Sequence, residues 1–224
     1  MREITWLIDG ATGALTVEGL SGWEAARLAG DLLPTPVTVN CARPVNVAPL
    51  TITRAGKALP PEKAELQLRV YRLYHGSLVD GPGRRSEAQV VGCEKFCPGC
   101  YVPETHNING GLALPVSEVV ARLLSGEGGP RDGVTILGGE PFLQPVALAA
   151  LLRELNTRGQ HVTVYSGYTL EELRARPEAA VRDALRHTDL LIDGPFVAAL
   201  AKDAGEWRGS TNQRFIERPA EAKL

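Results

Sequence analysis

From about residue 66 onward, hydrophobic positions recur in two alternating patterns. Short apolar runs of strand length lie at residues 89–91, 134–137, 161–165 and 189–192. Segments with apolar positions at helical spacing separate them, at residues 116–124, 146–155 and 170–185. Thr169 is placed to cap the last of these helices. This alternation of strands and helices predicts an α/β fold, with a parallel sheet or a partial (β/α) barrel.

The first 65 residues follow a different pattern. Segments 3–8 and 14–18 flank a turn-rich Asp-Gly-Ala-Thr-Gly sequence, which predicts a β-hairpin. A helical pattern over 23–33, with Ser21 as its N-cap, is followed by short strand-like pieces at 37–39 and 50–54.

Pro60-Pro61 then indicates a boundary. We therefore expect a small α+β region over residues 1–65 and a larger α/β domain over residues 66–224. The small region has no cluster of titratable residues, so it is interpreted as a packing or partner-docking module, with substrate recognition as the alternative.

Composition excludes several classes of protein. The 224 residues carry a formal net charge of -2 and show no strongly basic stripe, so nucleic acid is not an expected partner. No apolar run approaches the length of a membrane span, and the N-terminus lacks the layout of a signal peptide. We expect a cytoplasmic protein with no membrane partner.

Three of the four cysteines lie within eight residues, as Cys93, Cys97 and Cys100. In a cytosolic chain such spacing favours metal or redox chemistry over disulfides. Three thiolates of a C-x3-C-x2-C loop are suited to three irons of a [4Fe–4S] cluster, leaving the fourth iron open to a substrate. Two alternatives stay open: His106 as fourth ligand of a structural zinc site, or Cys41 as a distant fourth ligand. Cys41 is otherwise interpreted as a small buried hydrophobic residue.

A second group of residues follows the strand predicted at 134–137. Gly138, Gly139, Glu140 and Pro141 place two glycines and a carboxylate at the end of that strand. Glycine allows close approach of the backbone to a ligand, and a carboxylate accepts hydrogen bonds from an ammonium group. Alone this sequence is weak evidence, but one βα length after the cysteines it indicates a cofactor site.

Together these motifs resemble the radical S-adenosylmethionine (SAM) enzymes. Residues 79–85, Val-Asp-Gly-Pro-Gly-Arg-Arg, resemble the glycyl-radical-enzyme activases more narrowly. Two further stretches are similar to the activating proteins of anaerobic (class III) ribonucleoside-triphosphate reductase, at residues 164–173 and at residues 190–213. The resemblance covers about residues 70–216.

The resemblance implies a partial (β/α) barrel with a [4Fe–4S] cluster and SAM as cofactors. It implies that Cys93, Cys97 and Cys100 ligate three irons, while the fourth iron chelates SAM. The residues implied for the adenine end of SAM are Gly99, Cys100 and Tyr101. Those implied for the methionine end are Gly138, Gly139 and Glu140, and Ser166 and Gly167 are candidates for the ribose or carboxylate.

The activity implied is reductive cleavage of SAM to a 5′-deoxyadenosyl radical, which takes a hydrogen atom from a glycine of a partner enzyme. Anaerobic ribonucleotide reductase is the implied partner, and a flavodoxin or ferredoxin is the implied electron donor. Segment 86–91 is more polar than the strand usual in the family, and region 1–65 has no counterpart there. Both differences lie outside the motifs for the cluster and SAM. A radical SAM enzyme for a small molecule or peptide and a non-catalytic metal-binding module remain alternatives.

Some residues admit simpler interpretations. Arg85 is expected on the surface, near the cluster or in partner contact. Asp193 is expected to cap a turn, and His161 to begin a strand without a special role. Arg208 and Asn212 are expected to hold the C-terminal loop or meet the partner, and the tail from residue 217 is expected to fray.

Overall fold

The computed structural model describes residues 5–8, 15–18 and 65–223, and the chain divides into two units, Met1–Ala58 and Leu59–Leu224. In the first unit, β1 (Thr5–Ile8) and β2 (Leu15–Glu18) pair antiparallel, with Trp6 opposite Val17. The predicted hairpin is therefore confirmed. The other elements predicted before residue 65, and Cys41, lie outside the described residues.

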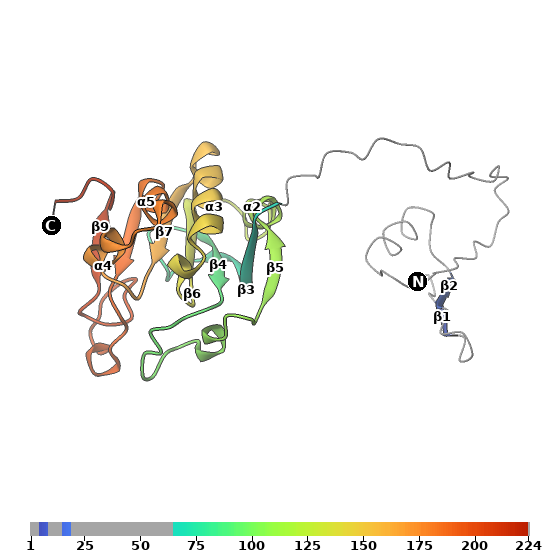
Figure 1. The fold of residues 1–224 in the computed structure, drawn as a ribbon, viewed down its shortest axis with the longest axis horizontal. Helices are drawn as coiled ribbons and strands as arrows, with labels where there is room; N and C mark the ends of the chain where they lie inside the picture. The colour runs from blue at the N-terminus through green and yellow to red at the C-terminus, as the bar shows by residue number, and fades with distance from the viewer. Residues whose placement is uncertain (1–4, 9–14, 19–64, 224) are drawn as a thin grey trace. The chain divides into compact units, whose positions relative to one another are not determined.

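The second unit is built on a seven-stranded mixed sheet, with strand order β5-β3-β4-β6-β7-β8-β9 (Figure 1). Four neighbouring strands run parallel, namely β4 (Arg85–Val90), β6 (Gly133–Gly138), β7 (His161–Tyr165) and β8 (Leu190–Asp193). Antiparallel strands flank them, namely β3 (Gln67–Ser77) and β5 (Leu112–Pro115) at one edge and β9 (Arg214–Glu217) at the other. The α/β class is thus confirmed.

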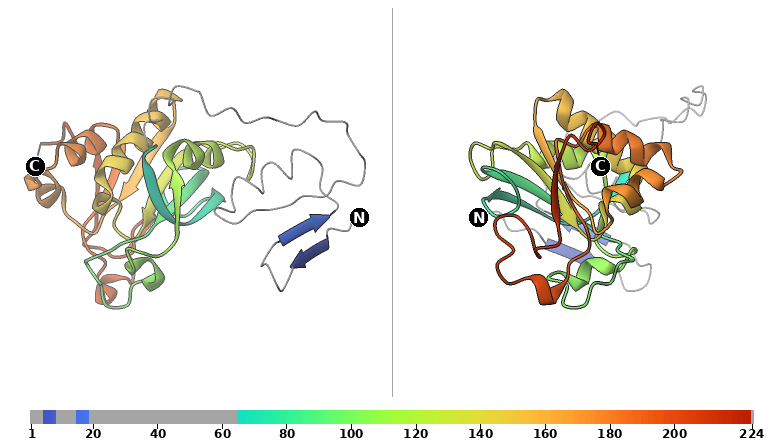
Figure 2. Two further views of the ribbon diagram at one scale, coloured as in Figure 1. Left: turned by 45° about the vertical axis from the view of Figure 1, so that its right-hand side comes forward. Right: turned by 90° about the vertical axis from the view of Figure 1, so that its left-hand side faces the viewer.

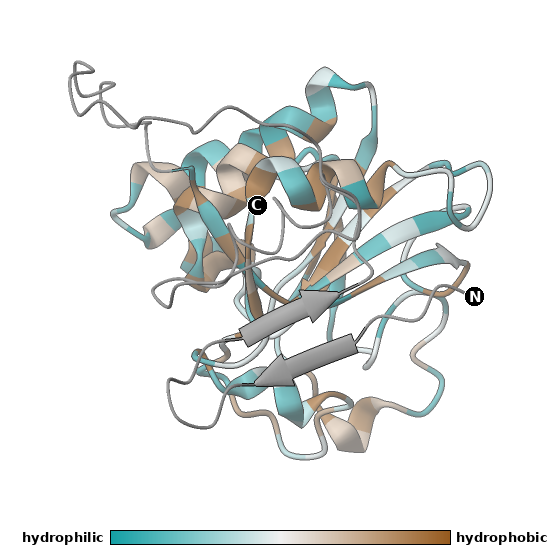
Figure 3. Ribbon diagram, turned by 90° about the vertical axis from the view of Figure 1, so that its right-hand side faces the viewer, coloured by the Kyte–Doolittle hydropathy of each residue, from teal (hydrophilic) through white to brown (hydrophobic). Residues whose placement is uncertain are grey.

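Helices cover one face of this sheet (Figure 2). They are α2 (Val116–Leu123), α3 (Pro145–Thr157), α4 (Leu170–Ala175) and α5 (Ala179–Arg186). The leucines of α3 that face the sheet are fully buried with Ile136 and Val164 of the strands. Figure 3 shows hydrophobic residues on the central strands and in stripes along the helices. Burial of these stripes against the strands supplies the core that holds the sheet and helices together.

One helix predicted as continuous is two helices in the structure. Thr169 caps α4 through a capping box with Glu172, as its residue type predicts. The helix then ends before Pro177, because a residue preceding proline avoids the helical conformation. Arg176 accordingly has φ -68° and ψ 136°, and the chain restarts as α5. The prediction of one helix over 170–185 was wrong at this proline.

The antiparallel edges were not predicted, and neither was the anchoring of the C-terminal tail. Strand β4 begins well before the apolar run at 89–91. Its first residues are polar, so the apolar pattern did not reveal them, although they are buried. Arg174 donates hydrogen bonds to the carbonyls of Pro219 and Ala222, at 2.8 and 2.7 Å. The tail is therefore tied to α4 rather than frayed.

Parallel strands bring their carboxyl ends to one edge, where the segments that follow them meet. Figure 1 shows the loop after β4 and the loop after β8 at this end of the sheet. None of the helices that the structure describes has the length and apolar content needed to span a bilayer.

Candidate functional site

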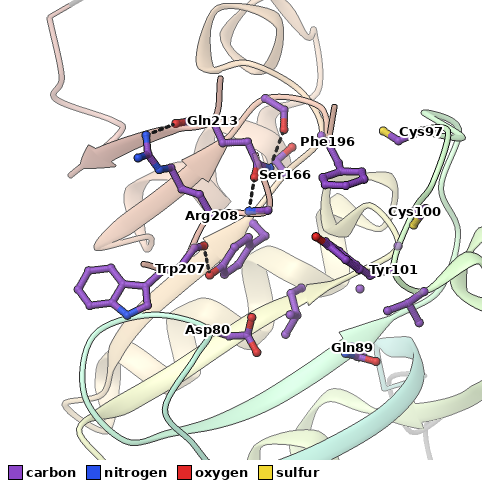
Figure 4. A pocket seen from close by; sticks show the side chains of 18 of the residues that line it. Asp80, Gln89, Cys97, Cys100, Tyr101, Ser166, Phe196, Trp207, Arg208 and Gln213 are labelled. Carbon is purple, nitrogen blue, oxygen red and sulfur yellow. Dashed lines mark hydrogen bonds between the residues drawn. The ribbon is translucent and has the colours of Figure 1, made fainter. Parts of the chain in front are cut away.

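A cavity of about 830 Å³ opens at the carboxyl ends of the parallel strands (Figure 4). Its walls come from five segments that are far apart in the sequence: the β3–β4 loop, the cysteine loop after β4, and the segments after β6, β7 and β8. All three clustered cysteines line it, together with Gly138, Gly139, Ser166 and Gly167. The structure thus brings nearly all of the predicted site residues to one cavity.

The cysteine loop holds its three thiols partly exposed toward this cavity. The Cys100 amide donates to the Cys97 carbonyl at 3.1 Å, closing a turn in which Gly99 has φ 77°. Few residues other than glycine adopt such a φ. The Cys93 amide donates to the His106 carbonyl at 3.2 Å, which closes the base of the loop. Burial raises the pKa of the Cys93 thiol.

The Gly-Gly-Glu segment is bonded directly to the start of the cysteine loop. Gly139 donates to the Val90 carbonyl at 2.8 Å, and Glu140 donates to the Gly92 carbonyl at 2.6 Å. A Cβ atom on Gly139 would lie 2.4 Å from the Gly92 oxygen, so no larger residue fits without a shift of the backbone. The glycines therefore serve the close approach of these two backbone segments as well as leaving an open wall.

Glu140 lies behind that wall, fully buried. Its carboxylate accepts hydrogen bonds from the amides of Phe142 and Gly167, at 3.0 and 2.7 Å, and from the Ser166 hydroxyl at 3.0 Å. Burial raises the pKa of Glu140 to about 7, although these hydrogen bonds favour the ionised form. Ser166 and Gly167 reach the cavity, whereas Glu140 connects their turn to the cysteine loop.

The predicted adenine-side residue Tyr101 is 72% exposed at the cavity rim. Its ring lies 4.9 Å from that of Phe196, which belongs to the loop after β8 (Figure 4). Leu78 and Val79 of the β3–β4 loop also line the cavity and are strongly exposed. Exposed and partly exposed apolar side chains from three loops therefore contribute to the lining of the cavity, together with the thiols.

His106 also faces this cavity, and its buried Nε2 has no hydrogen-bond partner in the described structure. Its ring packs edge-to-face on Phe96 at 5.1 Å. Among residues 5–8, 15–18 and 65–223, however, no three His, Cys, Asp or Glu side chains are arranged to hold one metal ion. The thiols line a wide cavity instead, which disfavours the compact zinc site.

Several residues do not have the roles first expected. Arg85 is 1% exposed at the amino end of the strands, away from the cysteines, and its guanidinium donates to Val134 and His161 carbonyls. It is neither a surface residue nor a cluster neighbour, and His161 does have a role as its partner. Asp193 accepts from the Leu170 amide at 2.6 Å and from Arg214, so it does hold the start of α4.

The loop after β8 is fixed by its own polar side chains. Arg208 donates to the Gln213 carbonyl at 3.2 Å, and Asn212 donates to the Pro195 carbonyl at 2.8 Å. Arg208 and Trp207 also line the cavity (Figure 4). The first of the two interpretations offered for Arg208 and Asn212, support of this loop, agrees with these contacts.

Among the lining residues that sequence reasoning missed are Gln89, Lys95, Tyr165 and Trp207. Gln89 follows Glu87 by two positions on β4, and alternation places both side chains on the face opposite the helices. Lys95 lies between two of the cysteines, which was a signal that went unused. Trp207 has φ 60°, a backbone conformation no sequence pattern reveals.

The donor set and the walls fit an iron–sulfur cluster with a second cofactor beside it. Three thiols from one loop offer the soft ligands that iron–sulfur clusters take. The adjacent wall includes the backbone of Gly138, Gly139 and Gly167. A site of this kind defines a class of redox enzyme in which a cluster reacts with a bound organic cofactor.

Comparison with known proteins agrees with this class. The family described as "4Fe-4S single cluster domain" matches residues 79–216. The anaerobic ribonucleoside-triphosphate reductase-activating proteins of Salmonella typhi and Escherichia coli (strain K12) are 33% and 31% identical over 153 residues, which is 65% of this chain and 96% of each relative. A pyruvate formate-lyase-activating enzyme of Clostridium pasteurianum is 33% identical over 131 residues, covering 55% of this chain and 50% of that protein.

The chain therefore belongs to the radical SAM family of glycyl-radical-enzyme activases. It is an oxidoreductase whose cofactors are a [4Fe–4S] cluster and SAM. The resemblance stated from the motifs is confirmed.

Proposed function

We propose that this enzyme generates a glycyl radical on an anaerobic ribonucleoside-triphosphate reductase. The relatives that match over 96% of their length are named anaerobic ribonucleoside-triphosphate reductase-activating proteins. The observation that carries the proposal is the pairing of the cysteine loop with the Gly-Gly-Glu segment at one cavity, through the bonds from Gly139 and Glu140. Reduction of the bound cluster supplies the electron that cleaves SAM to methionine and a 5′-deoxyadenosyl radical.

In this proposal Cys93, Cys97 and Cys100 hold the cluster, and the chain's other residues orient SAM. Tyr101, with Gly99 and Cys100, takes the adenine end, where its exposed ring beside Phe196 offers a stacking surface. The backbone of Gly138 and Gly139 takes the methionine end. Ser166 and Gly167 take the ribose or carboxylate from the adjacent turn.

Glu140 acts in this arrangement from behind the wall. Its oxygens are bonded to Ser166, Gly167 and Phe142, and it does not line the cavity. We propose that it fixes the turn that meets the methionine end of SAM. For Glu140 to contact the ammonium group of SAM directly, its carboxylate would have to give up one of these hydrogen bonds.

Two finer features complete the proposal. The four parallel strands, with helices on one face and the cavity at their carboxyl ends, are the core of a partial (β/α) barrel of the radical SAM type. A reduced flavodoxin or ferredoxin is the proposed electron donor, because a one-electron carrier matches the chemistry of the cluster.

The test is anaerobic reconstitution with iron and sulfide, followed by dithionite reduction with SAM. Four irons per chain and formation of 5′-deoxyadenosine are expected. Addition of an anaerobic ribonucleotide reductase is expected to yield a glycyl radical signal in electron paramagnetic resonance (EPR) spectra. Formation of 5′-deoxyadenosine without any radical on the reductase would contradict the proposed partner and leave the chemistry of SAM in place.

A further inference from the structure

The cysteine loop is fastened to the turn after β7 by contacts that the proposed roles of the site residues do not use. Lys95, between Cys93 and Cys97, places its ammonium group 3.9 Å from the centre of the Tyr168 ring. The same ammonium group lies 3.4 Å from a carboxylate oxygen of Glu172. Glu94 accepts a hydrogen bond from the Tyr168 hydroxyl. We call Glu94, Lys95, Tyr168 and Glu172 the clasp.

The clasp joins two segments that line the cavity, the cysteine loop and the turn after β7. Glu94 and Lys95 belong to the cysteine loop, whereas Tyr168 directly follows Ser166 and Gly167, and Glu172 lies in α4. A Cβ atom on Gly167 would lie 2.9 Å from Lys95 Cγ, so the lysine stem packs directly on the turn. The Tyr168 amide donates to the Ser166 hydroxyl at 3.1 Å, which in turn donates to Glu140.

The environment of Lys95 favours a fixed position over a solvated one. Its side chain is 21% exposed, and it has an aromatic face and a carboxylate as partners. Glu172 is itself held by the capping box, because its carboxylate accepts from the Thr169 amide at 2.7 Å. A cation held over an aromatic ring and partly removed from water gains more than an exposed ion pair.

We infer that Lys95 is a positioning residue that holds the cysteine loop at a fixed separation from the Ser166–Gly167 turn. This inference rests on the proposed function, in which the cluster and SAM bind on the two sides that the clasp joins. Lys95 then affects the binding of SAM to the cluster-containing enzyme, because it sets the position of the cysteine loop. The three thiols stay available in its absence, so cluster assembly does not depend on it.

The test compares Lys95→Met and Lys95→Arg in the full-length, reconstituted protein. Methionine keeps the apolar stem and removes the cation, whereas arginine keeps a cation that reaches both Tyr168 and Glu172. Titration of the EPR spectrum of the reduced cluster with SAM is expected to give a Kd raised roughly 5- to 30-fold in Lys95→Met. Recovery of most of that affinity is expected in Lys95→Arg.

The matched control is Arg158→Met, at the residue directly after α3, which removes a cation from an ion pair with Glu154 at 2.8 Å outside the cavity. Its SAM affinity is expected to equal that of the wild type. Lys95→Met with the affinity of this control would overturn the inference. So would Lys95→Arg with an affinity as poor as that of Lys95→Met, because the cation would then not be the active feature.

A second measurement separates this inference from the proposed function. In cluster-free, full-length protein, Lys95→Met is expected to speed amide hydrogen exchange at Cys93 and Cys100, whose amides are bonded within the loop. Unchanged exchange would contradict the clasp, whatever the enzyme does with SAM. Wild-type protein that holds no cluster would contradict the proposed function, while the exchange result would still decide on the clasp.

If Lys95→Met assembles no cluster, the claim that assembly is independent of Lys95 is wrong. The pair Tyr168→Phe and Tyr168→Leu then tests whether the contact between the Lys95 cation and the Tyr168 ring supports SAM binding. Phenylalanine keeps the ring beneath the cation and is expected to bind SAM more tightly than leucine does. Equal affinities in the two variants would overturn the role of the cation.

Discussion

A buried ionisable side chain lies at each end of the parallel strands, Arg85 at one and Glu140 at the other. Both are held by hydrogen bonds to backbone groups. At the amino end, Arg85 is 1% exposed and donates to carbonyls of Pro82, Val134 and His161. At the carboxyl end, Glu140 is fully buried and accepts from backbone amides and one hydroxyl. Neither has an ion-pair partner among the described residues.

The two ends differ in what surrounds the charge. Arg85 closes its end by joining the first residues of β4, β6 and β7 through hydrogen bonds to backbone carbonyls. Glu140 joins loops, and those loops leave an open cavity in front of it. Burial lowers the pKa of Arg85 to about 10, so it stays charged at neutral pH, whereas Glu140 titrates there. One end therefore serves stability and the other serves binding.

The largest effect is expected at the open end from loss of a thiol. Replacing Cys93, Cys97 or Cys100 with Ala is expected to abolish cluster assembly and formation of 5′-deoxyadenosine, because in the proposed function each thiolate holds one iron. Iron content and 5′-deoxyadenosine are the measurements. Cys41→Ser is the matched control and is expected to keep its iron. Normal iron and activity in any one of the three Ala variants would remove that cysteine from the ligand set.

At the closed end, Arg85→Met is expected to lower the free energy of unfolding by roughly 2–4 kcal/mol, because the buried carbonyls that it bonds are left without donors. Chemical denaturation measures this loss. Arg84→Met, at the neighbouring exposed position with one bond to Gly128, is the control and is expected to change stability little. An equal loss in both variants would mean that Arg85 does not secure the strands.

The two ends also differ in how far the sequence predicted them. The open end was found from the spacing of its cysteines and from Gly-Gly-Glu-Pro, because each of these motifs is contained in a few consecutive residues. The closed end was missed, since an arginine beside a Gly-Pro-Gly turn looks like a surface residue until its partners on β6 and β7 are known. Strands β3 and β9 were also missed, although the first residues of β3 alternate between exposed or partly exposed polar positions and buried apolar positions.

The ends of helix α4 were decided by signals within a few residues of sequence. Thr169 is the N-cap that was expected, and the structure adds Glu172 to it as a capping box. Pro177 ended the helix that periodicity alone had continued. Glu140 was expected to contact the methionine end of SAM, and the sequence did not indicate that its carboxylate is fully buried. That burial depends on Ser166 and Gly167, which come 26 and 27 positions later.

Replacing Glu140 tests whether the open end depends on its buried anion. Glu140→Ala is expected to weaken SAM binding by roughly 1.5–3 kcal/mol while the cluster still assembles, since the Gly167 amide and Ser166 hydroxyl lose their charged acceptor. The Kd for SAM, from EPR titration, is the measurement. Glu140→Gln keeps an acceptor and is expected to lose less. An unchanged affinity in Glu140→Ala would show that the turn holds its shape alone.

The smallest effect is a pH dependence confined to the open end. Burial raises the pKa of Glu140 from 4.5 to about 7, so the folded state binds a proton that the unfolded state has released between these values. The stabilisation from this proton is complete below about pH 4.5 and is lost as the pH rises through 7. Between pH 6 and 8 the wild type is expected to lose about 1 kcal/mol from this group.

Glu87 has a pKa raised to about 7 as well, so the wild-type profile alone does not isolate Glu140. The difference between the wild type and Glu140→Gln does, because Glu87 is present in both proteins. The measurement is urea denaturation of cluster-free protein at pH 6, 7 and 8. From pH 6 to pH 8, the free energy of unfolding of the wild type is expected to fall by about 1 kcal/mol relative to that of Glu140→Gln. A constant difference would mean that Glu140 stays ionised, with the amides of Phe142 and Gly167 outweighing its burial. The two ends would then be alike in charge, and only the cavity would distinguish them.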